Sequence, residues 1–150
     1  MTTVPATVVE RDELPVLFVP AADELDAIRA AWDELERRIG SLRGRRFFGT
    51  FDPTTKEYRA SVEARDDHDA AALGLEPGTI AGGTYLRTRL RGEPPDVYER
   101  IAPTFAALAQ IVQSDDTRAS IEFYRRRDEI DLLLPVRSSA QGGSGPLMSS

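Results

Sequence analysis

The sequence ASIEFY at residues 119–124 leads into EIDLLLP at residues 129–135, and together these runs predict a β-hairpin. Successive side chains of a strand point to opposite faces, so Glu122 and Tyr124 share one face while Ile121 and Phe123 share the other. Glutamate is uncommon in strands and needs a reason. A solvated sheet edge is one reason, since exposed glutamate is the rule. The other is a site in which a carboxylate beside an aromatic ring binds a cationic or hydrogen-bond-donating ligand.

The composition limits the fold and the chemistry. The chain has 150 residues, of which 41% are hydrophobic and 29% charged, and this is typical of a single globular domain with a core of its own. It has no cysteine, which excludes disulfides and thiolate metal sites. His68 is the only histidine and lies in a charged loop, where solvation explains it. We therefore expect no metal and no other cofactor.

The charge balance argues against nucleic acid as a partner. The formal net charge is −6, Lys56 is the only lysine, and arginine supplies the other positive charges. An acidic surface repels phosphate backbones, and no basic stripe or helix-turn-helix segment offsets this, so we expect no direct nucleic-acid binding. Neither a leader-like N-terminus nor an apolar run of membrane-spanning length is evident, which favours a cytoplasmic protein that does not contact membranes.

Two helices follow from apolar spacing. The first carries apolar residues at steps of three or four, which predicts one buried stripe. These residues are Leu25, Ile28, Trp32, Leu35, Ile39 and Leu42. The second opens at Pro94-Pro95-Asp96, and its apolar positions are Val97, Ile101, Phe105, Leu108 and Val112. Because proline interrupts helical hydrogen bonding, Pro103 predicts a kink or two short helices near Ala102.

The strand pattern repeats. An interrupted strand spans residues 7–19, a hairpin joins 47–51 to 58–62, and a strand at 79–90 contains Gly82-Gly83, which predicts a bulge or a close backbone approach. Each half thus reads strand, helix, strand, strand. An offset of 72 residues sets Thr50 against Glu122, so only one half carries the carboxylate.

Two βαββ units predict an α+β fold: one antiparallel sheet with two main helices packed on it and a ligand cleft between the halves. We expect this domain to occupy residues 1–136. The Ser- and Gly-rich residues 137–150 read as a flexible tail.

Several of these motifs occur together in a known order. Trp32, Phe48-Gly49, Glu57-Tyr58-Arg59, Gly82-Gly83-Thr84-Tyr85 and Ile121-Glu122-Phe123-Tyr124 follow one another. This order resembles the GyrI-like small-molecule-binding domain, which is the effector-binding part of multidrug-sensing and AraC-type transcription activators and also occurs as a standalone protein. The resemblance covers about residues 7–136. It implies the duplicated βαββ fold with its cleft, and it implies that Glu122 is the acidic anchor for cationic or polar aromatic ligands.

The resemblance also suggests which rings line the cleft. Trp32, Tyr85 and Tyr124 correspond to the family's cleft-lining aromatic residues, and Tyr58 and Phe48 are further candidates. Each has a structural alternative. Trp32, Tyr58 and Phe48 suit a core position, and Tyr85 suits partial cover of a sheet.

Three functions remain open at this point. The leading hypothesis is a standalone binding protein for amphipathic, cationic or polyaromatic small molecules, related to multidrug binding and transcription regulation. The second is a hydrolase of reactive small molecules, which the family includes, with Glu122 as the catalytic residue acting on water. The third is a protein-interaction inhibitor, after the gyrase-inhibiting members, and it requires a protein partner. The oligomeric state stays open.

Overall fold

The computed structural model describes residues 5–40, 44–65 and 69–137, which form one eight-stranded sheet and four helices. The strands are β1 (Thr7–Arg11), β2 (Leu14–Ala22), β3 (Phe47–Asp52), β4 (Glu57–Glu63), β5 (Glu76–Ile80), β6 (Gly83–Arg91), β7 (Ser120–Arg126) and β8 (Glu129–Pro135). The helices are α1 (Leu25–Ile39), α2 (Asp69–Leu73), α3 (Asp96–Glu99) and α4 (Ile101–Ile111). The predicted α+β class is confirmed.

The strand order is β1-β6-β8-β7-β3-β4-β2-β5, and every neighbouring pair is antiparallel. One half comprises β2, α1, β3 and β4, the other β6, α3, α4, β7 and β8, and the halves meet where β3 pairs with β7. The two predicted βαββ units therefore share one sheet. The edge strands are exchanged: β1 precedes β2 in the chain but pairs with β6, and β5 precedes β6 but pairs with β2.

The first helix follows its apolar stripe. Leu35 and Ala31 are buried against β2 and β4. The helix ends at Ile39 and is capped by Gly40, whose positive φ of 79° suits a residue without a side chain. Leu25, the first residue of the predicted stripe, is 62% exposed. Leu42 lies outside the described residues.

The second helical region is two helices, as Pro103 predicted. The break falls at Arg100, between α3 and α4, and Pro103 lies in the first turn of α4, where a missing N–H leaves no hydrogen bond unmade. Leu108 is fully buried and joins α4 to the half of the sheet that contains β6 and β8.

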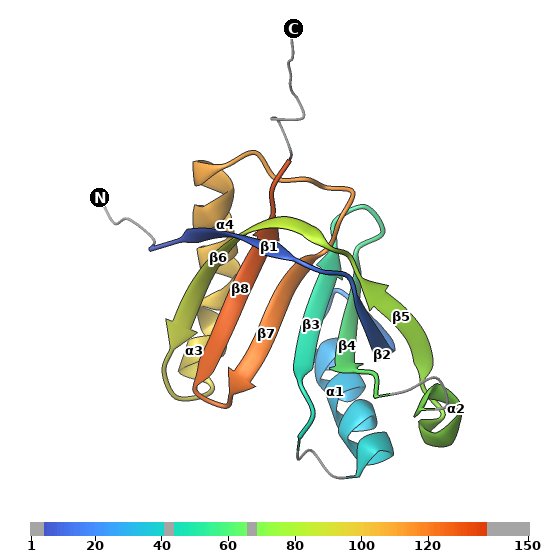
Figure 1. Cartoon of the computed structure of the whole chain (residues 1–150). Coiled ribbons are helices and arrows are strands. Elements are labelled where there is room, and N and C mark those ends of the chain that lie inside the picture. The colour runs from blue at the N-terminus through green and yellow to red at the C-terminus, as the bar shows by residue number, and fades with distance from the viewer. Residues whose placement is uncertain (1–4, 41–43, 66–68, 138–150) are drawn as a thin grey trace, which may run out of the picture.

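Both long helices lie on one side of the sheet (Figure 1). Under α1 the sheet presents Tyr58, Ala60 and Val62, and under α4 it presents leucine and isoleucine side chains of β6 and β8. The opposite side has its own cluster, which comprises Val16, Phe48, Ile80, Tyr85, Ile121 and Leu133. We call these two sides the helix face and the open face.

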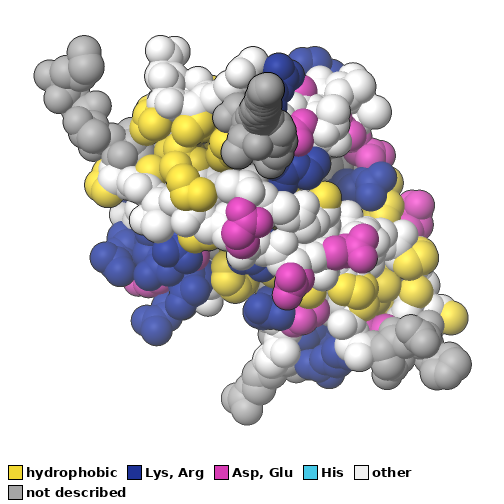
Figure 2. Space-filling model, turned by 45° about the horizontal axis from the view of Figure 1, so that its top comes forward, with side chains coloured by type: hydrophobic (Ala, Val, Ile, Leu, Met, Phe, Trp, Pro, Cys, Tyr) yellow, Lys and Arg dark blue, Asp and Glu magenta, His cyan; other side chains and the backbone are white. Residues whose placement is uncertain are grey.

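Charged side chains of both signs are interspersed on the surface that Figure 2 shows. Arginine–carboxylate pairs such as Arg46–Glu63, whose Nη2 and Oε2 atoms lie 2.5 Å apart, account for part of this mixture. Within the part of the chain that the structure describes, no helix combines the length and the apolar character needed to cross a membrane.

Candidate functional site

Glu122 lies at the junction of the two halves, on the helix face. On β7 it sits directly across from Gly49 of β3 on one side and Leu132 of β8 on the other. Strand alternation puts Tyr124 on the same face and Ile121 on the open face, as the sequence predicted. The carboxylate therefore lies between the α1-covered and α4-covered parts of the sheet.

Two phenols converge on one carboxylate oxygen. The Tyr58 hydroxyl donates to Glu122 Oε1 over 2.9 Å, and the Tyr124 hydroxyl donates to the same oxygen over 2.5 Å. The Trp32 indole Nε1–H donates to the Tyr58 hydroxyl oxygen over 3.1 Å. These four residues, from α1, β4 and β7, form one network that we call the Glu122 network.

Gly49 makes this network possible. A Cβ atom at position 49 would lie 2.0 Å from the Tyr58 hydroxyl oxygen and 2.6 Å from Glu122 Oε1. The Tyr58 phenol thus crosses β3 through the space that a side chain would occupy. Glycine inside a strand often marks such a close approach, so Gly49 itself was the sign of this contact in the sequence.

More aromatic rings surround the network than the sequence identified. Trp32 packs edge-on against Tyr124 with ring centroids 5.3 Å apart, and Phe47 lies 6.4 Å from Trp32. Tyr98 of α3 packs edge-on against Tyr124 at 6.4 Å and is 44% exposed, so it reaches solvent. Neither Phe47 nor Tyr98 was predicted. For Phe47 the reason is that strand alternation alone does not say which of two adjacent phenylalanines shares a face with Glu122.

Burial dominates the electrostatics of the network. It raises the pKa of Glu122, while the hydrogen bonds from Tyr124 and Tyr58 oppose that rise. Burial, and next the charge of Glu122, raise the pKa of Tyr58 and of Tyr124 well above 10. Both phenols therefore stay protonated as donors. Among the described residues no cation contributes to the pKa of Glu122, so its charge is met only by neutral groups.

Two predicted site residues lie elsewhere. Tyr85 is 1% exposed on the open face, where it pairs with Val9 and its hydroxyl donates to the Ala81 carbonyl oxygen over 2.6 Å. Phe48 also faces that side, where it stacks on Phe123 with centroids 4.8 Å apart. The sheet thus separates Tyr85 and Phe48 from Glu122 and corrects their assignment to one cleft, whereas it brings Trp32, Tyr58 and Tyr124 together.

Two further expectations have different outcomes. Thr50, which an offset of 72 residues aligned with Glu122, pairs with Ile121 and faces the open side, so the two do not occupy matching positions. His68 falls outside the described residues.

Several solved structures have a similar fold. An integron cassette protein from the mobile metagenome of Vibrio cholerae matches with a TM-score of 0.72 and 15% identity, over 88% of this chain and 95% of that one. SAV2435, solved bound to tetraphenylphosphonium, matches with a TM-score of 0.69 and 11% identity, over 89% and 94%. The C-terminal domain of EcmrR matches with a TM-score of 0.64 and 11% identity, over 92% and 100%. The chain has the GyrI-like fold.

The GyrI-like resemblance seen in the sequence is thereby confirmed at the level of the fold. No protein-family model matches the sequence, and no curated protein does. At such low sequence identities the structural matches show only that the strands and helices are arranged in the same way. The chemistry of the site has to be argued from its own residues.

Proposed function

We propose that this GyrI-like chain binds amphipathic cationic or polyaromatic small molecules at the Glu122 network. The observation that supports the proposal is a desolvated carboxylate held by two phenols and, among the described residues, by no cation. Leaving such a charge uncompensated costs free energy, and a ligand cation that approaches Glu122 recovers part of that cost. The same cost selects against neutral and anionic ligands.

The surrounding rings suit a ligand that is both cationic and aromatic. Trp32, Tyr124, Phe47 and the partly exposed Tyr98 offer faces and edges for stacking. A cation over such a ring gains about 0.5–2 kcal/mol, and a ring pair gains a similar amount. SAV2435, which shares the fold, is bound to tetraphenylphosphonium, a compound of this chemical class.

Trp32 offers a direct readout, because it is the only tryptophan and it contacts two members of the network. We expect tetraphenylphosphonium to change its fluorescence with saturation, and Glu122→Gln to weaken that binding about tenfold or more, the worth of a charged interaction. Triphenylphosphine oxide, which is aromatic but neutral, should bind weakly and equally to both proteins.

The matched control is Glu76→Gln, which removes a carboxylate from the exposed surface of β5. It should leave the affinity for tetraphenylphosphonium unchanged. An equal loss for cationic and neutral ligands in Glu122→Gln would disprove the charge-anchor role. If tetraphenylphosphonium causes no saturable fluorescence change in the wild type, the proposed binding at the Glu122 network is disproved.

A second candidate is hydrolysis of a reactive small molecule in the same place. It is favoured by one observation: a carboxyl group with a raised pKa flanked by protonated phenols is arranged for general acid–base catalysis. A hydrolase from Listeria innocua shares the fold with a TM-score of 0.54 and 12% identity. Mass analysis of each bound compound after incubation tests this, and product formation that survives Glu122→Gln unchanged would exclude Glu122 as the base.

A further inference from the structure

The open face of the sheet contains a cavity of about 200 Å³ on the side away from Glu122. Its lining includes Val16, Thr50, Ser61 and Ile121 from the sheet, Ala81 from the turn between β5 and β6, and Arg118 from the loop before β7. Strand alternation separates this lining from the Glu122 network, since Ser61 is adjacent to Ala60 and Ile121 to Glu122. The cavity is thus distinct from the site proposed above.

Among the residues that the structure describes, two buried side-chain polar atoms have no hydrogen-bond partner, and both belong to residues that line this cavity: Ser61 Oγ and Arg118 Nη1. Ser61 is only 1% exposed, so bulk water does not satisfy its hydroxyl. A buried polar group without a partner costs about 1–3 kcal/mol, and such groups are rare enough in folded proteins to call for an explanation. Both atoms can donate a hydrogen bond, and neither has an acceptor.

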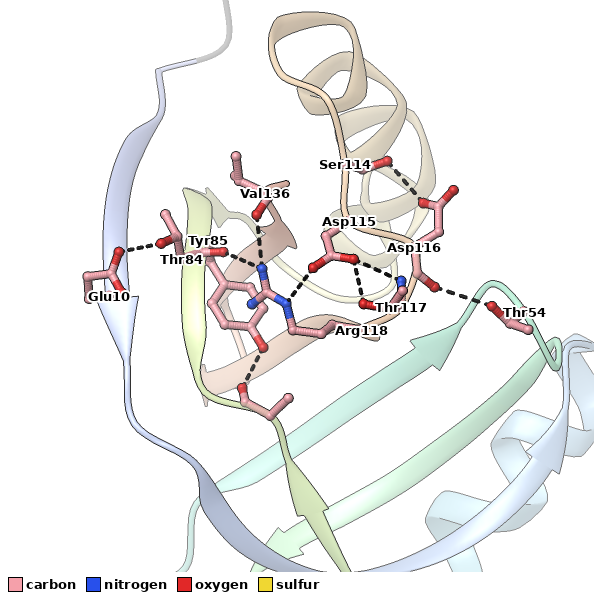
Figure 3. A network of polar contacts seen from close by, with 11 residues as sticks. Glu10, Thr54, Thr84, Tyr85, Ser114, Asp115, Asp116, Thr117, Arg118 and Val136 are labelled. Carbon is pink, nitrogen blue, oxygen red and sulfur yellow. Dashed lines mark hydrogen bonds and ion pairs between the residues drawn. The ribbon is translucent and has the colours of Figure 1, made fainter. Parts of the chain in front are cut away.

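The rest of the Arg118 side chain is held firmly (Figure 3). Its Nε donates to Asp115 Oδ2 over 3.1 Å, and its Nη2 donates to the carbonyl oxygens of Thr84 and Val136 over 3.1 and 3.0 Å. The guanidinium carbon lies 4.8 Å above the Tyr85 ring. Fixed by these contacts, Nη1 cannot turn elsewhere to find a partner.

Gly83 leaves the space that this arginine needs. A Cβ atom at Gly83 would lie 2.6 Å from Arg118 Nη1, and its φ of 134° is also unfavourable for other residues. The close backbone approach that Gly82-Gly83 predicted occurs at Gly82, where a Cβ atom would lie 2.8 Å from the Glu13 backbone nitrogen, and Gly83 adds the approach to the Arg118 guanidinium. The start of β6 at Gly83 thus leaves room for the buried guanidinium of Arg118.

The other charged side chains of the lining already have polar partners. Arg59 Nε pairs with Glu57 Oε1 over 2.8 Å, and Asp52 Oδ1 accepts the Thr54 backbone N–H over 2.8 Å. What remains are the Ser61 hydroxyl and the Arg118 Nη1 amino group, donors that match a carboxylate. The two acidic side chains disfavour a ligand with a second negative charge. A water molecule takes up about 30 Å³ of liquid, so the cavity has room for about six, or for one small organic acid.

We propose that this cavity binds a small monocarboxylate of amino-acid size or less, with Ser61 and Arg118 as its donors. The site is independent of cation binding at Glu122. A carboxylate has two acceptor oxygens, one for each of the two donors.

The test uses ¹⁵N-labelled full-length chain titrated with sodium acetate and with glycine, against sodium chloride at equal ionic strength. We expect saturable shifts of the Ser61, Ile121 and Arg118 amides, with the Trp32 indole unchanged. Acetamide, the neutral match, and inorganic phosphate should give none. Ser61→Ala should raise the apparent Kd for acetate about tenfold or more, and it should fold normally because removing an unsatisfied buried hydroxyl is neutral or stabilising.

Ser120→Ala, on β7 but on the helix face, is the matched control and should bind acetate as the wild type does. The proposal is overturned if acetamide shifts the same amides as strongly as acetate. It is also overturned if Ser61→Ala binds acetate with the wild-type Kd. A third contrary result is that no probe shifts these amides more than sodium chloride does, which would mean that the cavity holds only water. None of these results depends on whether Glu122 binds a cation.

Discussion

At the scale of single residues, Gly49 shows how the site depends on a missing side chain. It lies directly across from Glu122, and the Tyr58 phenol occupies the space above its Cα atom. The hydrogen bond from Tyr58 to Glu122 therefore requires a residue without a Cβ atom on the strand between them. A small change at position 49 should act on two members of the Glu122 network at once.

Gly49→Ala is expected to lower the free energy of unfolding by about 1–3 kcal/mol, the usual effect of overpacking. The new methyl group would lie 2.0 Å from the Tyr58 hydroxyl oxygen and 2.8 Å from Tyr58 Cζ. Adding Tyr58→Phe removes the closer contact, so the double variant should recover part of the loss. A double-mutant cycle in urea measures this coupling, and additive effects of the two changes would contradict the steric explanation.

Strand alternation predicted some residues of the site and missed others for one physical reason. Along a single strand it fixes which side chains share a face, and so Glu122 and Tyr124 were correctly grouped. It does not relate the faces of two strands until their register is known. Tyr85 and Phe48 were therefore grouped with Glu122 although they lie on the open face, while Phe47, one residue away, was missed.

At the scale of elements, helices were predicted more fully than the sheet. The α1 stripe and the break near Pro103 follow from local spacing, which the sequence contains. The exchange of β1 and β5 between the halves does not, because it depends on pairing between residues 58 or more positions apart. Such pairing is decided by burial of the whole sheet and leaves no local signal.

The short helix α2 depends on a buried ion pair. Five residues are too few for a stable helix in isolation, and Asp69 at its start receives Arg45 Nη1 over 3.1 Å and the Arg65 backbone N–H over 3.0 Å. The Arg45 and Asp69 side chains are only 8% and 10% exposed. The hydrogen bond from Arg45 is the main cause that lowers the pKa of Asp69 below 3.8.

Asp69→Ala should lower the free energy of unfolding by about 2–4 kcal/mol at pH 7, because it leaves a buried guanidinium without its carboxylate. Since the folded pKa of Asp69 is depressed, its contribution is present above about pH 4 and is lost as pH falls through the folded pKa. Urea unfolding measures the difference. Arg37→Ala breaks the exposed pair with Glu34 and should cost less than about 1 kcal/mol; equal losses from both variants would refute the role of burial.

At the scale of the whole molecule, the exchanged edge strands join the two halves. Each half's outermost strand comes from the segment that begins the other half, and the β3–β7 pairing adds a second connection at the centre. Neither half can separate from the sheet without exposing strands of the other. We therefore expect a titration at the central Glu122 to influence the stability of the whole domain.

Burial raises the pKa of Glu122 in the folded protein, so the folded chain retains this proton to a higher pH than the unfolded chain does. The free energy of unfolding consequently falls as pH rises from the unfolded pKa, near 4.5, to the folded pKa, and the deficit stays constant above it. Glu122→Gln keeps an oxygen that accepts both phenols but does not ionise. It should be more stable than the wild type at pH 7, by about 1.4 kcal/mol for each unit of pKa difference.

This advantage should disappear below about pH 4, where Glu122 is protonated in both states. Urea unfolding of the wild type and Glu122→Gln between pH 4 and pH 8 measures it, with Glu76→Gln as the control for loss of one surface charge. If the free energies of unfolding of Glu122→Gln and the wild type instead change with pH in the same way, the Glu122 carboxylate is solvated and its ionisation does not destabilise the folded chain. The same result would remove the free-energy cost on which selection for a cationic ligand at this site depends.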